Sequence, residues 1–84
     1  MEHKVILPQL ERTKKRTRII EWRRREGDRI ERGQVLFVAE TDKGTYFYDV
    51  KVSGVLSKIL VKRGEYVAMG SVVGIITSDG DESA

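Results

Sequence analysis

Short runs of apolar, β-branched and aromatic residues alternate with polar turns that contain glycine along the whole chain. The runs cover residues 3–7, 18–22, 35–39, 46–52, 55–61 and 72–77. Such residues favour strands, whereas glycine and aspartate favour the turns between them. No stretch keeps a helical period, and the longest candidate, residues 19–30, is interrupted by Gly27. The pattern therefore predicts an all-β domain.

An internal repeat relates the two halves of the chain. Residues 20–43 match residues 57–80 at a constant offset of 37. The matching pairs are Gly27 with Gly64, Asp28 with Glu65, Ile30 with Val67, Gly33 with Gly70, Leu36 with Val73 and Asp42 with Asp79. Two copies are too few for a solenoid. We therefore expect a flattened β-barrel or sandwich of two antiparallel sheets, related by a pseudo-twofold axis.

Alternation along the predicted strands also predicts the core. In a strand, every second side chain points to the same face, so Ile20 and Trp22 should lie on one side. The residues expected to be largely buried are Ile20, Trp22, Ile30, Leu36, Ile59, Val67, Val73 and Ile75.

A polar stretch of five residues, 40–44, separates two of the predicted strands. We interpret it as a hairpin turn, because aspartate suits the first position of a type I turn and glycine accepts the positive φ that often follows. Lys43 would then stand at the apex, exposed to water. Under the repeat, the turn at residues 78–80 is its counterpart and carries Gly80 in place of Lys43.

The 84 residues correspond to one domain, which we expect over residues 1–78, with an acidic tail or the start of a linker at 79–84. The absence of cysteine excludes disulfides and thiolate sites, and indicates an intracellular, cytoplasmic setting. No apolar run approaches the roughly 20 residues of a membrane span, so we expect no membrane association.

Catalytic patterns are not apparent. The single histidine, His3, lies near a terminus, and Ser53, Ser57 and Ser71 have no neighbouring base. Glu40 and Asp42 are two carboxylates on an open turn, without the burial that separates the pKa values of an acid–base pair. No phosphate loop, dinucleotide fingerprint or metal-ligand spacing is present. The chain is therefore not expected to be a catalyst by itself.

The whole pattern resembles a lipoyl domain of the biotinyl/lipoyl carrier family, over about residues 4–77. The residues that carry the resemblance are Leu7-Pro8-Gln9-Leu10, Ile20-Glu21-Trp22, Glu26-Gly27-Asp28, Gly33-Gln34-Val35-Leu36, Glu40-Thr41-Asp42-Lys43, Ser53-Gly54, Gly64 and Gly70. The resemblance implies that Lys43 carries lipoic acid as an amide. It also implies that Glu40, Thr41, Asp42 and Gly44 form the hairpin that the modifying enzyme recognises.

By the same resemblance, the chain is a non-catalytic carrier, either whole or part of a dihydrolipoamide acyltransferase. Its lipoyl-lysine would act as a swinging arm that moves acyl groups and electrons between the active sites of a 2-oxo acid dehydrogenase-type complex. The implied partners are a lipoate ligase or lipoyl transferase, the 2-oxo acid dehydrogenase and the dihydrolipoamide dehydrogenase. The resemblance also places a basic loop beside the hairpin, comprising Arg12, Lys14, Lys15 and Arg16.

Three alternatives remain open at this level. A biotin carrier normally has methionines on both sides of its lysine, whereas Met1 and Met69 are far from Lys43. A nucleic-acid-binding barrel would use the basic segment of residues 12–32, with ten Arg or Lys against four Asp or Glu, and Tyr46 and Tyr48 for stacking if they faced outward. An unmodified structural module would need the fold but not the lysine.

Overall fold

Eight antiparallel strands form the domain in a computed structural model, which describes residues 2–8, 17–41 and 44–79. They are β1 (Glu2–Ile6), β2 (Thr17–Trp22), β3 (Arg29–Ile30), β4 (Val35–Thr41), β5 (Gly44–Asp49), β6 (Gly54–Ile59), β7 (Tyr66–Val67) and β8 (Val72–Ser78). The described residues include no helix. The two-residue strands β3 and β7 were not predicted, because the sequence shows only a single apolar residue between two turns at each place.

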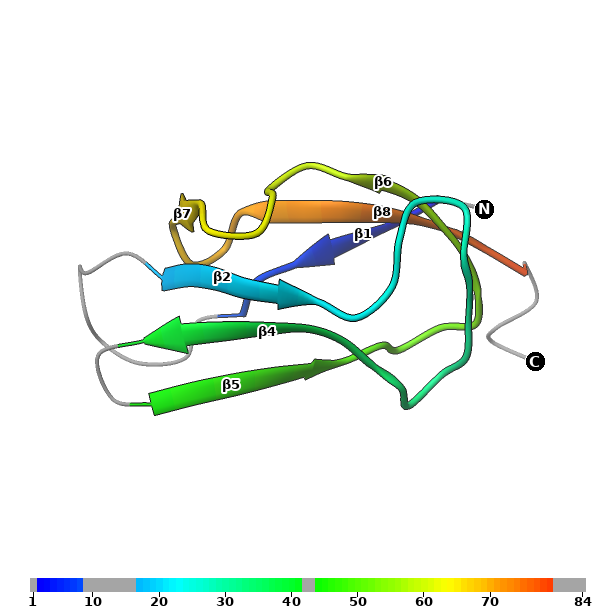
Figure 1. The fold of residues 1–84 in the computed structure, drawn as a ribbon. Coiled ribbons are helices and arrows are strands. Elements are labelled where there is room, and N and C mark those ends of the chain that lie inside the picture. The colour runs from blue at the N-terminus through cyan, green and yellow to red at the C-terminus, as the bar shows by residue number, and fades with distance from the viewer. Residues whose placement is uncertain (1, 9–16, 42–43, 80–84) are drawn as a thin grey trace.

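Two four-stranded sheets lie face to face, as Figure 1 shows. The first sheet has the order β1-β8-β6-β3, and the second has the order β5-β4-β2-β7. The paired end of β4 and β5 lies at one end of this sandwich, whereas β1 begins and β8 ends at the other (Figure 1). The predicted fold class, an all-β sandwich of two antiparallel sheets, is confirmed.

Reciprocal contacts between the two halves reveal the pseudo-twofold axis. The Gly27 amide donates to the Leu56 carbonyl over 2.7 Å, and the Gly64 amide donates to the Ile19 carbonyl over 2.6 Å. Both donors and both acceptors differ by 37 positions, so each half makes the same contact to the other. Gly27 and Gly64 have φ values of 94° and 89°, a region that favours glycine at these turns.

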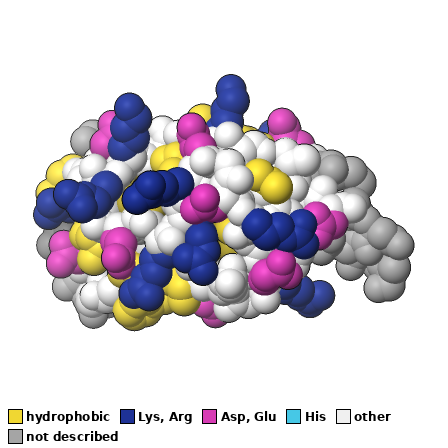
Figure 2. Space-filling view, turned by 45° about the vertical axis from the view of Figure 1, so that its right-hand side comes forward, with side chains coloured by type: hydrophobic (Ala, Val, Ile, Leu, Met, Phe, Trp, Pro, Cys, Tyr) yellow, Lys and Arg dark blue, Asp and Glu magenta, His cyan; other side chains and the backbone are white. Residues whose placement is uncertain are grey.

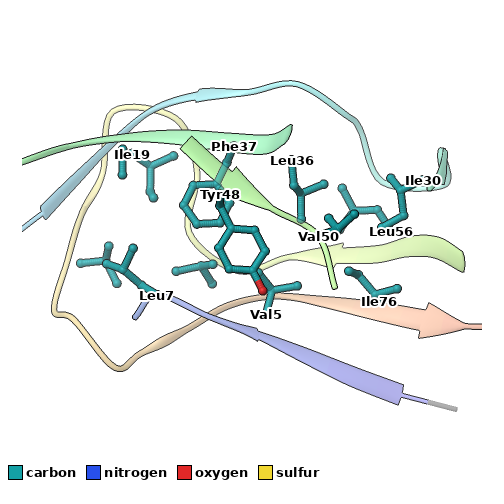
Figure 3. Close-up of a cluster of buried hydrophobic side chains, with 13 residues drawn as sticks. Val5, Leu7, Ile19, Ile30, Leu36, Phe37, Tyr48, Val50, Leu56 and Ile76 are labelled. Atoms are coloured by element: carbon teal, nitrogen blue, oxygen red, sulfur yellow. The ribbon is translucent and has the colours of Figure 1, made fainter. Parts of the chain in front are cut away.

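The sandwich interior is filled by aliphatic side chains from both sheets and by the stacked rings of Phe37 and Tyr48, whose centroids lie 4.9 Å apart (Figure 3). Four predicted core residues are buried there: Ile30, Leu36, Val67 and Val73. The other four predicted core residues are only partly buried: Ile20, Trp22, Ile59 and Ile75. Ile19, Leu56 and Ile76 are fully buried, although none of them was predicted.

Irregularities in strand register explain why the predicted core included Ile20 and omitted Ile19. The pairing of β2 with β4 shifts between Ile19 and Glu21, and the pairing of β6 with β8 shifts between Leu56 and Lys58. A bulge adds one residue on one side of a ladder and so interrupts the strict alternation of faces. Ile19 is therefore buried, and Trp22, three positions later, packs against the same core. Period two alone placed Ile20 on the wrong face.

Candidate functional site

The lysine hairpin is built from the longest pairing in the second sheet, which is regular from Phe37 to Thr41. Strands β4 and β5 pair from Val35 opposite Asp49 to Thr41 opposite Gly44. Only Asp42 and Lys43 connect these last partners in the sequence, and both residues lie outside the described part of the chain. The expected five-residue turn is therefore shorter, since Glu40, Thr41 and Gly44 belong to the strands.

The stem of the hairpin is anchored in the core as far as Ala39. Val38 and Ala39 are 4% and 0% exposed, whereas the next residue, Glu40, is exposed. The Thr41 hydroxyl donates to the Gly44 carbonyl over 3.2 Å. This side-chain hydrogen bond adds to the backbone pairing of the same two residues. Thr41 and Gly44, which flank Asp42 and Lys43 in the sequence, are thus held together at the end of the paired stem.

Gly44 has a conformation that few other residues tolerate. Its φ is 139°, and a Cβ added there would meet no atom within 4 Å. The space around it is open, so the backbone torsion rather than crowding is what favours glycine at this position. The sequence correctly predicted a positive φ after the lysine.

Charges of both signs lie beside the stem. Glu40 stands opposite Arg18 of β2 and opposite Thr45 of β5, and all three residues are exposed. Opposite charges on adjacent strands stabilise a sheet modestly. Sequence reasoning missed Arg18 as a neighbour of the hairpin, because the register of β2 against β4 depends on the bulge. The basic-loop residues Arg12, Lys14, Lys15 and Arg16 lie outside the described residues.

The counterpart of the hairpin lies at the opposite end of the sandwich and has a different structure. There β8 ends at Ser78, and the guanidinium of Arg29 holds the carboxylate of Asp79 through two hydrogen bonds of 2.7 and 2.8 Å. Hydrogen bonding from Arg29 lowers the pKa of Asp79, and hydrogen bonding to Asp79 raises the pKa of Arg29. The second copy of the repeat thus ends in an ion pair, while the first carries the lysine.

Other chemistry expected of a site is missing from the described residues. No three His, Asp or Glu side chains there come together in a way that could hold a metal ion. No helix in the described part of the chain has the length and apolar character needed to cross a membrane. Tyr48 is 6% exposed and stacked on Phe37, and burial raises its pKa. Tyr48 therefore does not provide the outward stacking surface that the nucleic-acid alternative required.

A two-sheet domain with an internal repeat, and a lysine in the sequence between the paired ends of β4 and β5, is the arrangement of a carrier module. The family model described as "Biotin-requiring enzyme", the biotin/lipoyl attachment domain, matches residues 3–76. The chain therefore belongs to the biotin/lipoyl carrier family. The expected family is confirmed, and so is the expected role as a carrier domain rather than a catalytic one.

Several relatives are components of pyruvate dehydrogenase complexes. The mouse mitochondrial pyruvate dehydrogenase protein X component is 32% identical over 94% of this chain and 16% of that protein. The dihydrolipoyllysine-residue acetyltransferase component of Rickettsia typhi is 29% identical over the whole chain and 21% of that protein. The corresponding Neurospora crassa component is 40% identical over 73% of this chain and 14% of that protein. The chain thus spans about a fifth or less of these relatives.

Proposed function

We propose that Lys43 carries lipoic acid in amide linkage and that the domain moves acyl groups and electrons between the active sites of a 2-oxo acid dehydrogenase-type complex. The observation that supports this most strongly is the placement of Glu-Thr-Asp-Lys-Gly at the end of the paired β4–β5 stem, within a domain of the biotin/lipoyl family. The names of the relatives supply the type of complex.

The residues of the stem fit such an attachment. A swinging arm needs a firm anchor, which the buried Val38 and Ala39 provide, and it needs open space, which exists around Gly44. When attached, lipoate supplies a dithiolane that accepts a group and electrons at one active site and releases them at another. The chain contributes the position of the arm, the charge pattern around it and its recognition by partner enzymes.

Attachment changes the charge of the hairpin. The Lys43 amine must lose a proton to attack an activated carboxyl group, and the resulting amide is neutral. Glu40 and Asp42 then remain as carboxylates beside an uncharged arm. We propose that these two acids serve recognition by a lipoate ligase or lipoyl transferase rather than acid–base chemistry.

Lipoylation by a purified lipoate ligase, followed by peptide mass mapping, tests the attachment site. We expect a single lipoyl group on Lys43 and none on the other six lysines. A variant in which Asp42→Lys is combined with Lys43→Asp keeps the composition but moves the amine by one position. It should fold normally and be lipoylated poorly, because the strands fix the direction of the turn. Equal modification of this variant would show that position in the hairpin is unimportant.

The same reaction distinguishes the biotin alternative. A biotin ligase acting on the wild-type chain in parallel should leave Lys43 unmodified. If the biotin ligase modifies Lys43 and the lipoate ligase does not, the domain is a biotin carrier. The cytoplasmic setting also remains a proposal, for which fractionation of the native host is the direct measurement.

We further propose that the basic loop meets an acidic surface on the 2-oxo acid dehydrogenase and accelerates the encounter. The residues of this loop are Arg12, Lys14, Lys15 and Arg16. Reversing all four charges should slow reductive acylation of the lipoylated domain at low salt, and the difference should shrink as salt screens the charges. Exposed lysines elsewhere, such as Lys51 and Lys58, offer a control for net charge. Identical rates at low salt would refute the proposal.

A further inference from the structure

A hollow of about 440 Å³ opens on the side of the sandwich, where the segments that follow β2 and β6 meet. It is lined by Trp22, Arg24, Arg25, Glu26, Ile59 and Lys62. Its volume falls within the range of about 300–1,000 Å³ that is typical of ligand-binding clefts. Figure 2 shows basic side chains on one face of the domain, with acidic and hydrophobic side chains exposed between them.

The hollow lies on the pseudo-twofold axis. Trp22 and Ile59 are equivalent positions of the repeat, and so are Arg25 and Lys62. The Trp22 indole N–H, in the first copy of the repeat, donates to the Val61 carbonyl of the second copy over 2.7 Å. In return, the Ile59 amide donates to Glu26 over 2.8 Å. These two crossed hydrogen bonds hold the residues that form the floor of the hollow.

The lining of the hollow has a positive charge balance, with three bases, Arg24, Arg25 and Lys62, and one acid, Glu26. Asp28 accepts from the backbone amide of Arg25 over 2.9 Å, and Glu65 accepts from the backbone amide of Lys62 over 2.6 Å. These nearby acids are therefore hydrogen-bonded to the main chain. Neither the guanidinium of Arg25 nor the ammonium of Lys62 forms an ion pair with an acid in the described ranges. Glu26, the only acid of the lining, accepts from the Ile59 amide, which fixes the direction of its carboxylate.

We propose that this hollow docks an acidic segment of a partner protein, with one large apolar side chain seated on Trp22 and Ile59 and flanking carboxylates bound by Arg25 and Lys62. An apolar floor within a cationic rim is complementary to that chemistry. A nucleic acid fits less well, because it has no aliphatic side chain to seat on the floor formed by Trp22 and Ile59.

The position of the hollow leaves the lysine hairpin accessible. Trp22 is paired with Phe37 of β4, four residues before the strand ends at Thr41. At about 3.3 Å per strand residue, the hairpin begins roughly 13 Å farther along the sandwich. A partner segment bound in the hollow would therefore hold the domain without covering the end of the β4–β5 stem at Thr41. The site would tether the carrier near an enzyme while its arm remains free.

The fluorescence of Trp22, which is the single tryptophan, reports directly on occupancy of the hollow. The probe is the capped peptide Asp-Glu-Leu-Glu-Asp, and the reference is the same peptide with glycine in place of leucine. We expect saturable binding of the leucine peptide at submillimolar to millimolar concentration. Burial of leucine should make this binding about tenfold tighter than that of the glycine peptide.

Two variants separate the local charge from the net charge. Arg25→Glu with Lys62→Glu should weaken binding of the leucine peptide about tenfold or more, because both rim charges become repulsive. Lys4→Glu with Lys51→Glu makes the same change in net charge at exposed positions outside the hollow and should leave binding within about twofold of wild type.

Three results would overturn the proposal. The first is absence of saturation by the leucine peptide up to about 10 mM, roughly a hundredfold above the tight end of the expected range. The second is equal weakening in the two double variants. The third is tighter binding of a single-stranded oligothymidylate than of the peptide, which would assign the surface to nucleic acid.

Discussion

Gly54 is the position where the fold depends most sharply on the absence of a side chain. A Cβ added to this residue would lie 2.2 Å from the Thr77 carbonyl oxygen and 2.7 Å from the Ser78 Cα. Both are backbone atoms of β8, the strand paired with β6. A methyl group therefore cannot be accommodated by a rotamer change, and β6 must move away from β8.

Forcing a methyl group into a packed contact typically costs about 1–3 kcal/mol of unfolding free energy. For a domain of this size, each kcal/mol lowers the melting temperature by about 4–8 °C. We therefore expect Gly54→Ala to melt at least several degrees below wild type in thermal and urea unfolding. Val55→Ala, at the exposed neighbouring position, is the control and should change stability far less. A Gly54→Ala protein with wild-type stability would refute the close approach of β6 and β8.

Two further substitutions test the interior and the end of the domain opposite the hairpin. The Thr17 hydroxyl is buried and has no hydrogen-bond partner among the residues that the structure describes. Thr17→Val should therefore raise the unfolding free energy by about 1 kcal/mol, measured by urea unfolding against Thr45→Val at an exposed position. Arg29 lowers the pKa of Asp79 below its ordinary value of 3.8, so the ion pair contributes stability above that value and loses it as pH falls through the lowered pKa. Stability of the wild type should therefore decline more steeply than that of Asp79→Asn in this acidic window, and Arg29→Ala should return the pKa of Asp79 towards its ordinary value in an NMR titration; parallel pH profiles would contradict the ion pair.

The repeat is the part of the fold that the sequence predicted best. An offset of 37 relates β2 to β6, β3 to β7 and β4 to β8 in the structure, as it relates their residues in the sequence. Glycines at turns carry this information because a positive φ restricts the residue type. Gly33 and Gly70, with φ values of 92° and 90°, are such a pair. Two-fold symmetry then follows from the equivalence of the two halves.

The strand faces were harder to predict, because a bulge leaves no clear mark in a single sequence. Ser57, at the shift in β6, and Ile20, at the shift in β2, do not resemble each other. The hollow beside Trp22 was missed for a related reason. A tryptophan within an apolar run predicts a core position, and only the crossed contacts of the two halves show that one side of its ring borders solvent.

For the candidate site, sequence and structure contribute different parts. The residues that would carry the chemistry, Asp42 and Lys43, rest on the motif, since they lie outside the described residues. The structure adds the paired stem, the buried anchor behind Glu40 and the open space at Gly44. The identity of a partner depends on two complementary surfaces, and this chain contains only one of them.

The most direct test of the central claim is the mass of the protein isolated from its native host, followed by mapping of the peptide that contains Lys43. The account predicts an increase equal to one lipoyl group, located on Lys43 and absent from a Lys43→Arg variant expressed in the same host. An unmodified Lys43 in the folded native protein, a biotinyl increment, or a lipoyl group on any other lysine would contradict it.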